Sequence, residues 1–341
     1  MKNASIKDIA ALAGVSTTTI SFVLNGKAEE KRISKELVSK IEKIAKKLNY
    51  SPNQIARGLR TGKTNSVGLM VEDISNPFFA SLAKVIEDEA DKHGYKLMYC
   101  STENNETRAK DLLKMLEYRQ MDGFIITPTV ELKKEIELLV QQKKPLVLID
   151  RYFPDYDTSY VAVDNYKGAY EAVSFLLAQG YKNVGLVTIS QEQVQMKERY
   201  RGYVDALKDR GHSLRKGSLL RIPFDAARKD AVALISAFLE RDSRPDALFF
   251  TTNYLGIYGL ESLRELQIKI PEDLGMVVFD DHDLFRFYSP AITVISQPIT
   301  EIGKLAVDML IGQLSKKPRK HHQHTLAPTL MVRASSKSKK P

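Results

Sequence analysis

Residues 5–25, Ser-Ile-Lys-Asp-Ile-Ala-Ala-Leu-Ala-Gly-Val-Ser-Thr-Thr-Thr-Ile-Ser-Phe-Val-Leu-Asn, decide the architecture of the N-terminal part of the chain. Ser5 and Asp8 have the spacing of a capping box, which predicts that a helix begins there. Gly14 then supplies the permissive backbone of a tight turn, and Ser16 can cap a second helix. Two short helices joined in this way predict a helix-turn-helix.

A small core is available to these two helices. Ile9, Leu12 and Ala13 share one face of the first helix. A third helix is predicted from Ser34 to about Leu48, with one apolar stripe against which the first two helices pack. That stripe consists of Leu37, Ile41, Ile44, Ala45 and Leu48.

The second helix carries the side chains that we expect to contact DNA. Thr17 and Thr18 stand at its outward start, where a hydroxyl can bond a base edge and a methyl can touch thymine. Ser16, Ser21 and Asn25 suit phosphate contacts, which fix the register on the duplex without recognising its sequence. The alternative for these small polar residues is simple helix capping.

Charge supports the DNA interpretation. The formal net charge is +9, and residues 1–65 carry 13 Lys and Arg against 5 Asp and Glu. Nearly all the excess positive charge therefore lies in the segment with the helix-turn-helix, as expected for an electrostatic footprint on phosphates. Binding should weaken steeply with salt.

Length and composition bound the remaining possibilities. With 341 residues and 43% hydrophobic content, the chain can form two or three domains. It has no stretch resembling a membrane span, and its first residues are polar where a signal peptide would be apolar, so a cytoplasmic protein without membrane association is expected. The single cysteine, Cys100, excludes an intramolecular disulfide, and its setting favours the end of a buried strand.

Residues 51–60 join this segment to the rest of the chain. Ser51 and Pro52 are typical of a helix start, with serine as the cap and proline at the first position. A helix of about two turns is marginal alone, so we expect it to form fully only against DNA or a second copy of itself. Residues 61–66 are predicted to be a flexible connector.

The body of the chain alternates short apolar runs with helical patterns. In its first half, strands are predicted at 67–71, 97–99, 124–126, 146–149 and 161–163, with helices near 77–93, 105–118 and 131–142. The pattern restarts with strands at 184–188, 219–222, 248–251, 276–279 and 293–295, and helices near 165–179, 197–210, 225–240 and 256–266. Two parallel α/β lobes are implied, with a ligand cleft between the carboxyl ends of their strands.

Several motifs in this order resemble the lactose/galactose repressor (LacI/GalR) family of bacterial transcription regulators. They are Ile-Lys-Asp-Ile-Ala-Ala-Leu-Ala-Gly-Val-Ser at 6–16, Asn-Tyr-Ser-Pro-Asn at 49–53, Ser-Asn-Pro-Phe-Phe at 75–79, Met-Asp-Gly-Phe at 121–124, Val-Asp-Asn at 163–165, Arg-Tyr-Arg-Gly-Tyr at 199–203, Pro-Glu-Asp-Leu at 271–274, Phe-Asp-Asp at 279–281 and Ser-Gln-Pro at 296–298. The resemblance covers essentially the whole chain.

The family fold implies an all-α helix-turn-helix headpiece followed by an α/β, two-lobed core like that of periplasmic binding proteins, with parallel sheets. The expected divisions are a headpiece at 1–50, a hinge helix and linker at 51–66, an N-terminal lobe at 67–163 with 298–322, and a C-terminal lobe at 164–297 with 323–341. The chain would pass between the lobes three times.

The resemblance also implies a transcription regulator, expected to be a repressor, that binds a palindromic operator as a homodimer. Asn53, Ala56 and Leu59 would contact DNA from the hinge helices, paired in the minor groove. Leu59 matches the apolar wedge that unstacks a central base step, and its alternative role is packing within the hinge.

By position, the resemblance places effector contacts at both sets of strand ends. They are Phe78, Phe79, Asp150, Arg151, Arg199, Phe224, Asn253, Asp280 and Gln297. Carboxylates and arginine forks bind hydroxyls or anionic groups and aromatic faces cover a ring, so a sugar or sugar derivative is expected, and an acidic or phosphorylated one stays open. The alternatives are core packing for Phe79 and Phe224, a turn cap for Asp280, and a surface salt bridge for Arg199.

Three features depart from the family pattern. Phe22 occupies a position on the second helix where many members carry a basic or imidazole side chain. Residues 29–31 lengthen the loop before the third helix. Tyr254 follows Asn253 where an acidic residue is common. The first two bear on operator preference and the third on effector choice.

An enzyme is not expected. Paired carboxylates such as Asp280 and Asp281, or Asp150 and Asp164, could serve glycoside hydrolysis, but adjacent side chains diverge in direction. The chain contains no phosphate-binding glycine loop, nucleophile elbow or zinc-binding spacing. No cofactor is therefore predicted.

Two further alternatives depend on the ends of the chain. His321, His322 and His324 could bind a metal, but their basic surroundings favour a solvated crossover, so no metal site is predicted. A two-lobed sugar-binding protein without a regulatory role is the main competing function, and the N-terminal headpiece argues against it. Residues 335–341 contain no leucine heptad, which favours a dimer over a tetramer. The sequence leaves open whether the effector induces or corepresses, and which operator and genes are involved.

Overall fold

The computed structural model describes residues 4–50, 63–190, 192–315 and 321–337. It divides into two compact units, Met1–Thr64 and Asn65–Pro341. The expectations for Asn53, Ala56, Leu59 and the hinge helix fall outside the described residues.

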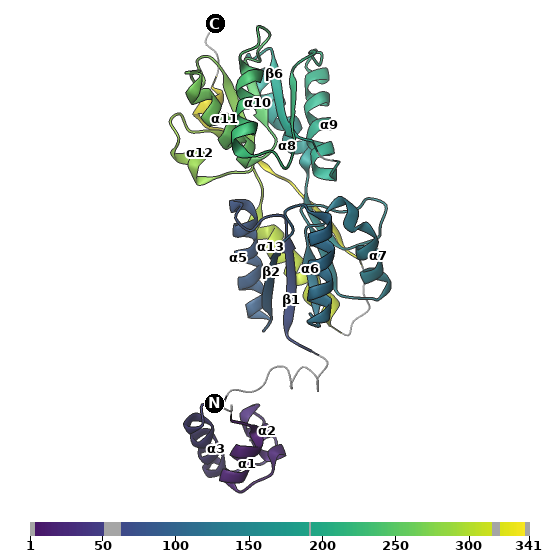
Figure 1. Cartoon of the computed structure of the whole chain (residues 1–341), viewed down its shortest axis with the longest axis vertical. Coiled ribbons are helices and arrows are strands. Elements are labelled where there is room, and N and C mark those ends of the chain that lie inside the picture. The colour runs from purple at the N-terminus through teal and green to yellow at the C-terminus, as the bar shows by residue number, and fades with distance from the viewer. Residues whose placement is uncertain (1–3, 51–62, 191, 316–320, 338–341) are drawn as a thin grey trace. The chain divides into compact units, whose positions relative to one another are not determined.

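The first unit contains the helices α1 (Ile6–Ala13), α2 (Thr17–Leu24) and α3 (Lys35–Lys47), drawn in purple in Figure 1. The predicted capping box is present: the Ser5 backbone N–H donates to Oδ2 of Asp8 at 2.7 Å, and the Asp8 N–H donates to Oγ of Ser5 at 3.4 Å. Gly14 takes a left-handed backbone with φ of 74°, which a residue with a side chain rarely adopts. Ser16 Oγ accepts the Thr19 N–H at 3.2 Å and so begins α2.

Three isoleucines, Ile9, Ile20 and Ile41, are fully buried where these helices meet. Leu12 is 60% exposed, which corrects the expectation that it shares the packing face with Ile9 and Ala13. The buried face of α1 is centred between Ile9 and Ala10, and at 100° per residue Leu12 falls outside it.

The second unit consists of two lobes, each built on a six-stranded sheet. The first sheet has the order β11-β5-β4-β3-β1-β2, and the second has the order β12-β10-β9-β8-β6-β7. The two orders correspond strand for strand. All strand pairs are parallel except β12, which pairs antiparallel with β10. The sequence-based expectation of parallel α/β lobes is confirmed.

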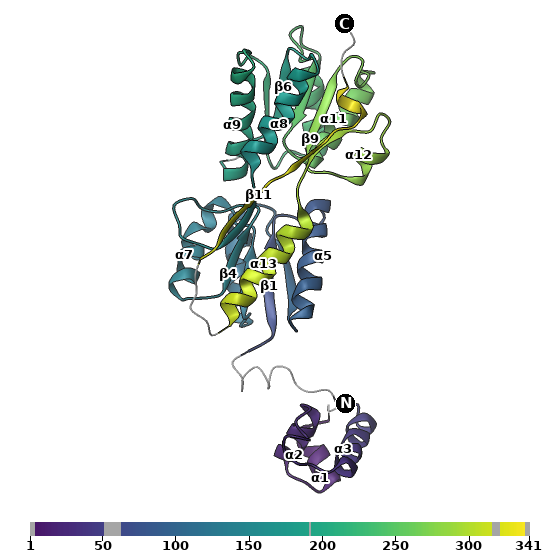
Figure 2. The ribbon, with the colours of Figure 1, turned by 180° about the vertical axis from the view of Figure 1, so that it is seen from behind.

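The first lobe takes its elements mostly from the first half of this unit. They are β1 (Ser66–Val71), α5 (Pro77–Lys92), β2 (Lys96–Ser101), α6 (Glu106–Tyr118), β3 (Gly123–Ile126), η1 (Val130–Leu132), α7 (Lys133–Gln141), β4 (Leu146–Ile149), β5 (Tyr160–Val163), α13 (Ile299–Leu314) and β11 (Gln323–Leu326). Figures 1 and 2 show α5 and α13 against one face of this sheet and α6 and α7 against the other. Strands β3 and β4 are buried at every residue, as expected for a sheet covered on both faces.

The second lobe repeats this layered plan. Its elements are α8 (Asn165–Ala178), β6 (Val184–Ile189), α9 (Val194–Asp209), β7 (Leu219–Ile222), α10 (Arg228–Leu239), β8 (Ala247–Phe250), α11 (Asn253–Glu265), β9 (Gly275–Phe279), α12 (Asp283–Phe287), β10 (Thr293–Ser296), β12 (Thr329–Met331) and η2 (Ala334–Ser336). Helices α8 and α9 cover one face of the sheet, and α10 and α11 cover the other. Gly202 permits close packing of α9 on α8, because a Cβ there would collide with the backbone oxygen of Tyr166.

The chain passes between the lobes three times, from β5 to α8, from β10 to α13 and from β11 to β12. The last crossing comes later than expected. Residues from 323 onward were assigned to the second lobe, but β11 pairs with β5 in the first sheet, with Gln323 opposite Tyr160. The backbone hydrogen bonds of an edge strand hold this segment, and its composition gives no signal of which sheet it joins.

Among the described residues, no single helix is long and apolar enough to span a membrane. Helices α1 and α2 satisfy that length and composition test only together, and they are bent by 106° relative to each other.

Candidate functional site

The carboxyl ends of the central strands of both sheets face one small cavity of about 40 Å³ between the lobes. This arrangement follows from topology, because ligand sites of parallel α/β sheets lie beyond the carboxyl ends of the strands. The residues that line the cavity, here called the cleft, are Glu72, Asn76, Phe78, Phe79, Asp150, Arg151, Ile189, Gln195, Met196, Arg199, Thr252, Asn253, Tyr254, Asp280 and Gln297.

Eight of the nine residues expected to contact an effector line the cleft. They are Phe78, Phe79, Asp150, Arg151, Arg199, Asn253, Asp280 and Gln297. Phe224 does not, and it packs against the core of the second lobe. It follows β7, which is the edge strand farthest from β9 and β10, so its loop starts away from the strand ends that form the cleft. Core packing, the alternative considered for Phe224, is what the structure shows.

Arg199 is held in place from several sides. It is 2% exposed, so a surface salt bridge is not its role. Its Nε donates to Oδ1 of Asn165 at 2.8 Å, one terminal nitrogen donates to the backbone oxygen of Thr251, and the guanidinium lies 3.5 Å from the ring centre of Phe279. A terminal nitrogen is 3.9 Å from a carboxylate oxygen of Asp280. Such a fixed guanidinium has little freedom to lose when a ligand binds.

Asp150 and Asp280 occupy equivalent positions after β4 and β9, and both have a left-handed backbone, with φ of 63° and 75°. Strain of this kind is typical of functional positions. Burial raises the pKa of Asp150 to about 7, with Asp280 adding to the shift and Arg199 opposing it. Burial also raises the pKa of Asp280, against the influence of Arg199 and of the hydrogen bond from Gln297 at 2.6 Å.

Arg151 was predicted from the sequence as an effector contact, but its partners Glu72 and Asn104 were not. Arg151 is 5% exposed, and its guanidinium donates to the carboxylate of Glu72 and, at 2.6 Å, to Oδ1 of Asn104. Its Nε lies 3.3 Å from a carboxylate oxygen of Asp150. Glu72 follows β1 directly, so the same strand-end rule that identified Asp150 could have identified Glu72.

Three buried polar atoms in the cleft have no hydrogen-bond partner among the described residues. They are Nε of Arg151, the hydroxyl of Tyr254 and Oε1 of Gln195. Burial raises the pKa of Tyr254 to about 12, so this side chain is a neutral hydroxyl at physiological pH. Buried polar atoms without partners are costly, and all three belong to residues that line the cavity in which a ligand could bond them.

Amide side chains bridge the two lobes on either side of the cleft. Asn253 Nδ2 donates to Oδ1 of Asn76 at 2.9 Å, and Gln193 Nε2 donates to Oδ1 of Asn104 at 3.3 Å. Asn76 also caps α5 through the Phe78 N–H. The lobes are therefore in direct contact through hydrogen bonds that their separation would break.

Asp281 and Asp164 have structural partners outside the cleft. Asp281 is bonded by Arg333 at 2.8 and 2.9 Å and by Arg286. Although burial opposes it, the bonds from Arg333 and Arg286 hold the pKa of Asp281 below its usual value. Asp164 caps α8 through the Lys167 N–H at 2.8 Å. Asp280 and its neighbour Asp281 therefore have different surroundings, as expected for adjacent side chains that diverge in direction.

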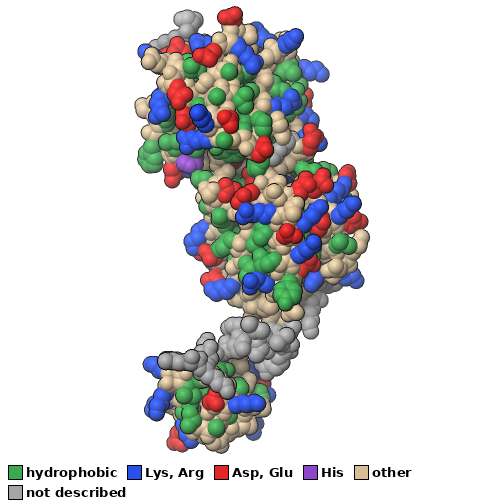
Figure 3. Space-filling model, viewed as in Figure 1, with side chains coloured by type: hydrophobic (Ala, Val, Ile, Leu, Met, Phe, Trp, Pro, Cys, Tyr) green, Lys and Arg blue, Asp and Glu red, His purple; other side chains and the backbone are tan. Residues whose placement is uncertain are grey.

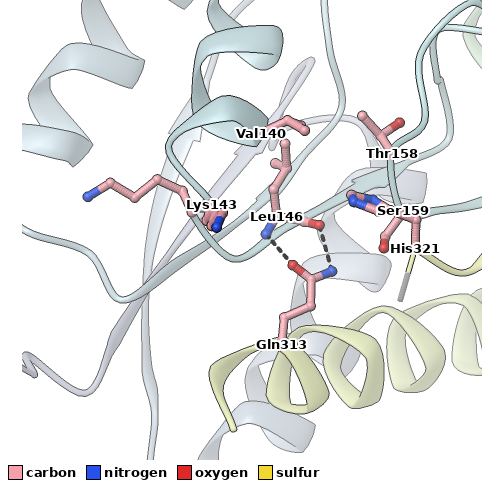
Figure 4. Close-up of a pocket in the computed structure, with 8 residues that line it drawn as sticks. Val140, Lys143, Leu146, Thr158, Ser159, Gln313 and His321 are labelled. Carbon is pink, nitrogen blue, oxygen red and sulfur yellow. Dashed lines mark hydrogen bonds between the residues drawn. The ribbon is translucent and has the colours of Figure 1, made fainter. Parts of the chain in front are cut away.

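A larger cavity of about 530 Å³ lies elsewhere in the first lobe, between the end of α7 and the end of α13 (Figure 4). Gln313 there pairs with the backbone of Leu146, accepting from its N–H at 2.8 Å and donating to its oxygen at 2.9 Å. His321 lies at its border. Within the described part of the chain no group of three or more His, Cys, Asp or Glu residues is placed to hold a metal ion.

In the first unit, Thr17 and Thr18 are exposed at the start of α2, as contacts with bases would require. Asn25 ends α2 and donates to the backbone oxygen of Ser21 at 2.6 Å. Lys and Arg side chains stand out from the surface of this unit in Figure 3. Phe22 and the lengthened loop at residues 29–31, which both differ from the family pattern, are in contact, since Nζ of Lys31 lies 5.4 Å from the ring centre of Phe22.

A helix-turn-helix unit with exposed cations and a two-lobed core with a polar cleft together define a class, the ligand-responsive DNA-binding regulators. Comparison with known proteins assigns the family. Residues 5–53 match the model of bacterial regulatory proteins of the lacI family, and residues 173–336 match a periplasmic binding protein-like domain.

Relatives match over nearly the full length. The ribose operon repressor of Haemophilus influenzae is 31% identical, covering 97% of this chain and 98% of its own. The HTH-type transcriptional repressor PurR of Pasteurella multocida is 28% identical, covering 98% and 99%. The solved lac repressor dimer bound to operator and the anti-inducer ONPF superposes with a TM-score of 0.87 at 19% identity, covering 99% and 100%. The chain belongs to the lacI family and is a ligand-responsive, DNA-binding transcription regulator.

Proposed function

We propose that this protein is a repressor that binds a palindromic operator as a homodimer and is controlled by an uncharged sugar or sugar derivative in the cleft. The proposed effector contacts are the eight expected residues that line the cleft, joined by Glu72, Gln195 and Tyr254. The proposed DNA contacts are Ser16, Thr17, Thr18, Ser21 and Asn25, together with Asn53, Ala56 and Leu59 of the hinge.

One observation carries the effector proposal. Two strand-end aspartates, two buried guanidinium groups and the unpartnered polar atoms of Tyr254 and Gln195 line one cavity. Carboxylates accept hydrogen bonds from vicinal hydroxyls, and guanidinium forks donate to hydroxyl oxygens. The phenyl rings of Phe78 and Phe79 offer an apolar surface to a sugar ring. The relative named a ribose operon repressor agrees with this class of effector.

Control of DNA binding follows from the bridges between the lobes. A ligand with different affinities for the open and closed arrangements shifts the balance between them. Because operator affinity and effector affinity are then linked, each ligand changes the other's binding by the same factor. The sign of that coupling decides between induction and corepression.

The effector is found by measuring thermal unfolding of the full chain against sugars, sugar acids, sugar phosphates and nucleobases, since a bound ligand raises the unfolding temperature. We expect a neutral sugar to do so. Arg199→Lys should lose the ligand-dependent shift, because lysine cannot reproduce the fork that holds Asn165 and Thr251. Arg210→Lys, at the exposed residue that follows α9, is the matched control and should keep it. A ligand shift that survives Arg199→Lys unchanged would contradict the assignment of the cleft.

A further inference from the structure

The Glu72–Arg151 pair sets the charge of the cleft. Both side chains are buried, at 7% and 5% exposed, and the carboxylate of Glu72 accepts directly from the guanidinium of Arg151. Asn104 accepts from the other terminal nitrogen of Arg151, and a carboxylate oxygen of Asp150 lies 3.3 Å from its Nε. Both terminal nitrogens of Arg151 are thus bonded by acceptors of its own lobe, and Nε lies near the Asp150 carboxylate without a hydrogen bond.

The second guanidinium is similarly occupied. Arg199 donates to Asn165 and to the backbone of Thr251, and Asp280 lies 3.9 Å away. The charged residues that line the cleft are Glu72, Asp150, Asp280, Arg151 and Arg199. Three carboxylates therefore face two guanidinium groups, so the formal charges of the cleft leave no surplus positive charge to balance an acidic ligand.

The helix N-termini beside the cleft have several of their backbone amides bonded by side chains. The Phe78 N–H of α5 is already bonded by Asn76 at 3.1 Å. At the start of α11, the Tyr254 N–H is bonded by Asn253 at 2.7 Å and the Leu255 N–H by Thr252 at 3.4 Å. These three amides at the two helix starts therefore already have side-chain acceptors, which weakens both starts as sites for an anion.

We infer that Glu72 is a specificity-determining residue, which neutralises Arg151 so that the cleft accepts uncharged, hydroxyl-rich ligands and rejects acidic or phosphorylated ones. This inference rests on the proposed function of the cleft as the effector site. Glu72 and Asp150 present acceptors to ligand hydroxyls, and the Tyr254 hydroxyl and Gln195 Oε1 supply a donor and a further acceptor.

The test compares matched ligand pairs on the full-length protein by calorimetry: ribose with ribose 5-phosphate, glucose with glucose 6-phosphate, and glucose with gluconate. Inorganic phosphate is a separate probe of the charge alone. The variant is Glu72→Gln, which keeps the shape and an oxygen acceptor for Arg151 but removes one negative charge. Glu265→Gln, exposed near the end of α11, makes the same charge change away from the cleft.

Wild-type protein is expected to bind the neutral member of a pair and not its anionic partner. In Glu72→Gln, the preference for the neutral member should fall about tenfold to a hundredfold. The Glu72 carboxylate would no longer repel the bound anion, and a repulsion between two charges about 6 Å apart has an effect of that order. Glu72→Gln should also gain stabilisation by inorganic phosphate, and the double variant Glu72→Gln/Arg151→Gln should lose that gain. Glu265→Gln should behave as wild type.

The results distinguish the proposal that the cleft is the effector site from the proposal that Glu72 determines its specificity. Tighter binding of the anionic member to the wild type would overturn the role of Glu72 while leaving the cleft as an effector site. Absence of binding by every sugar would refute the proposed sugar effector, and the phosphate measurements would still decide the role of Glu72. Equal phosphate response of wild type and Glu72→Gln would overturn that role.

Discussion

Asp150→Asn should change how the stability of the ligand-free protein depends on pH. In the folded protein the pKa of Asp150 is raised from 3.8 to about 7, chiefly by burial. The unfolded chain therefore loses this proton from about pH 4 upward, while the folded protein keeps it until about pH 7. The protonated carboxyl contributes stability that is fully present below pH 4 and is lost as the pH rises through 7.

The magnitude follows from the shift. About three pKa units correspond to on the order of 4 kcal/mol, lost at about 1.4 kcal/mol per pH unit between pH 4 and pH 7. Asparagine has nearly the same shape, tolerates the left-handed backbone at this position and does not titrate.

The assay is denaturant unfolding of the full chain from pH 4.5 to pH 8, for wild type, Asp150→Asn and the exposed control Asp111→Asn. Asp150→Asn should differ from wild type by no more than about 1 kcal/mol near pH 4.5, and its relative stability should rise to on the order of 4 kcal/mol above pH 7. Asp111→Asn should follow wild type throughout. Parallel profiles for wild type and Asp150→Asn would refute the argument that burial raises this pKa.

Three further predictions concern packing, the lobe contact and DNA binding. Gly202→Ala should lower the free energy of unfolding by about 1–3 kcal/mol, because its Cβ would meet the backbone of Tyr166. Gly312→Ala, where a Cβ has open space, should not destabilise the protein. Equal effects of the two substitutions in thermal unfolding would count against the close α8–α9 packing. In a double-mutant cycle, Asn76→Ala and Asn253→Ala should show a coupling energy of about 0.5–1.5 kcal/mol, and additive effects on unfolding would argue against their bridge. Raising the salt concentration from 50 to 200 mM should weaken operator binding, measured by fluorescence anisotropy, by at least about tenfold. An operator affinity that does not depend on salt would contradict the proposed phosphate contacts.

Local patterns predicted most of the secondary structure because each element carries its own signal. The capping box at Ser5, the turn at Gly14 and the cap at Ser16 are all present where the sequence places them. Which residues of a short helix are buried is harder to predict from sequence, because a shift of one residue along the helix can move a side chain from the core to the exposed face, as Leu12 shows.

The cleft was predictable to the extent that strand ends and family motifs identify it. Asp150 and Asp280 directly follow central strands, and both meet in the cleft. The order of strands within a sheet is set by long-range pairing, so the position of Phe224 after an edge strand could not be predicted from local pattern. The contact between Glu72 and Arg151 joins two loops 79 positions apart in the chain, and only the folded first lobe brings them together.

The central claim is that occupation of the cleft controls operator binding, and one measurement tests it directly. DNA fragments enriched on the purified full-length protein supply the operator, and its affinity is then measured with and without the ligand that raises thermal stability. We expect the ligand to change operator affinity by about 5- to 150-fold, and this change should be lost in Arg199→Lys and kept in Arg210→Lys. Ligand binding that leaves operator affinity unchanged would contradict it.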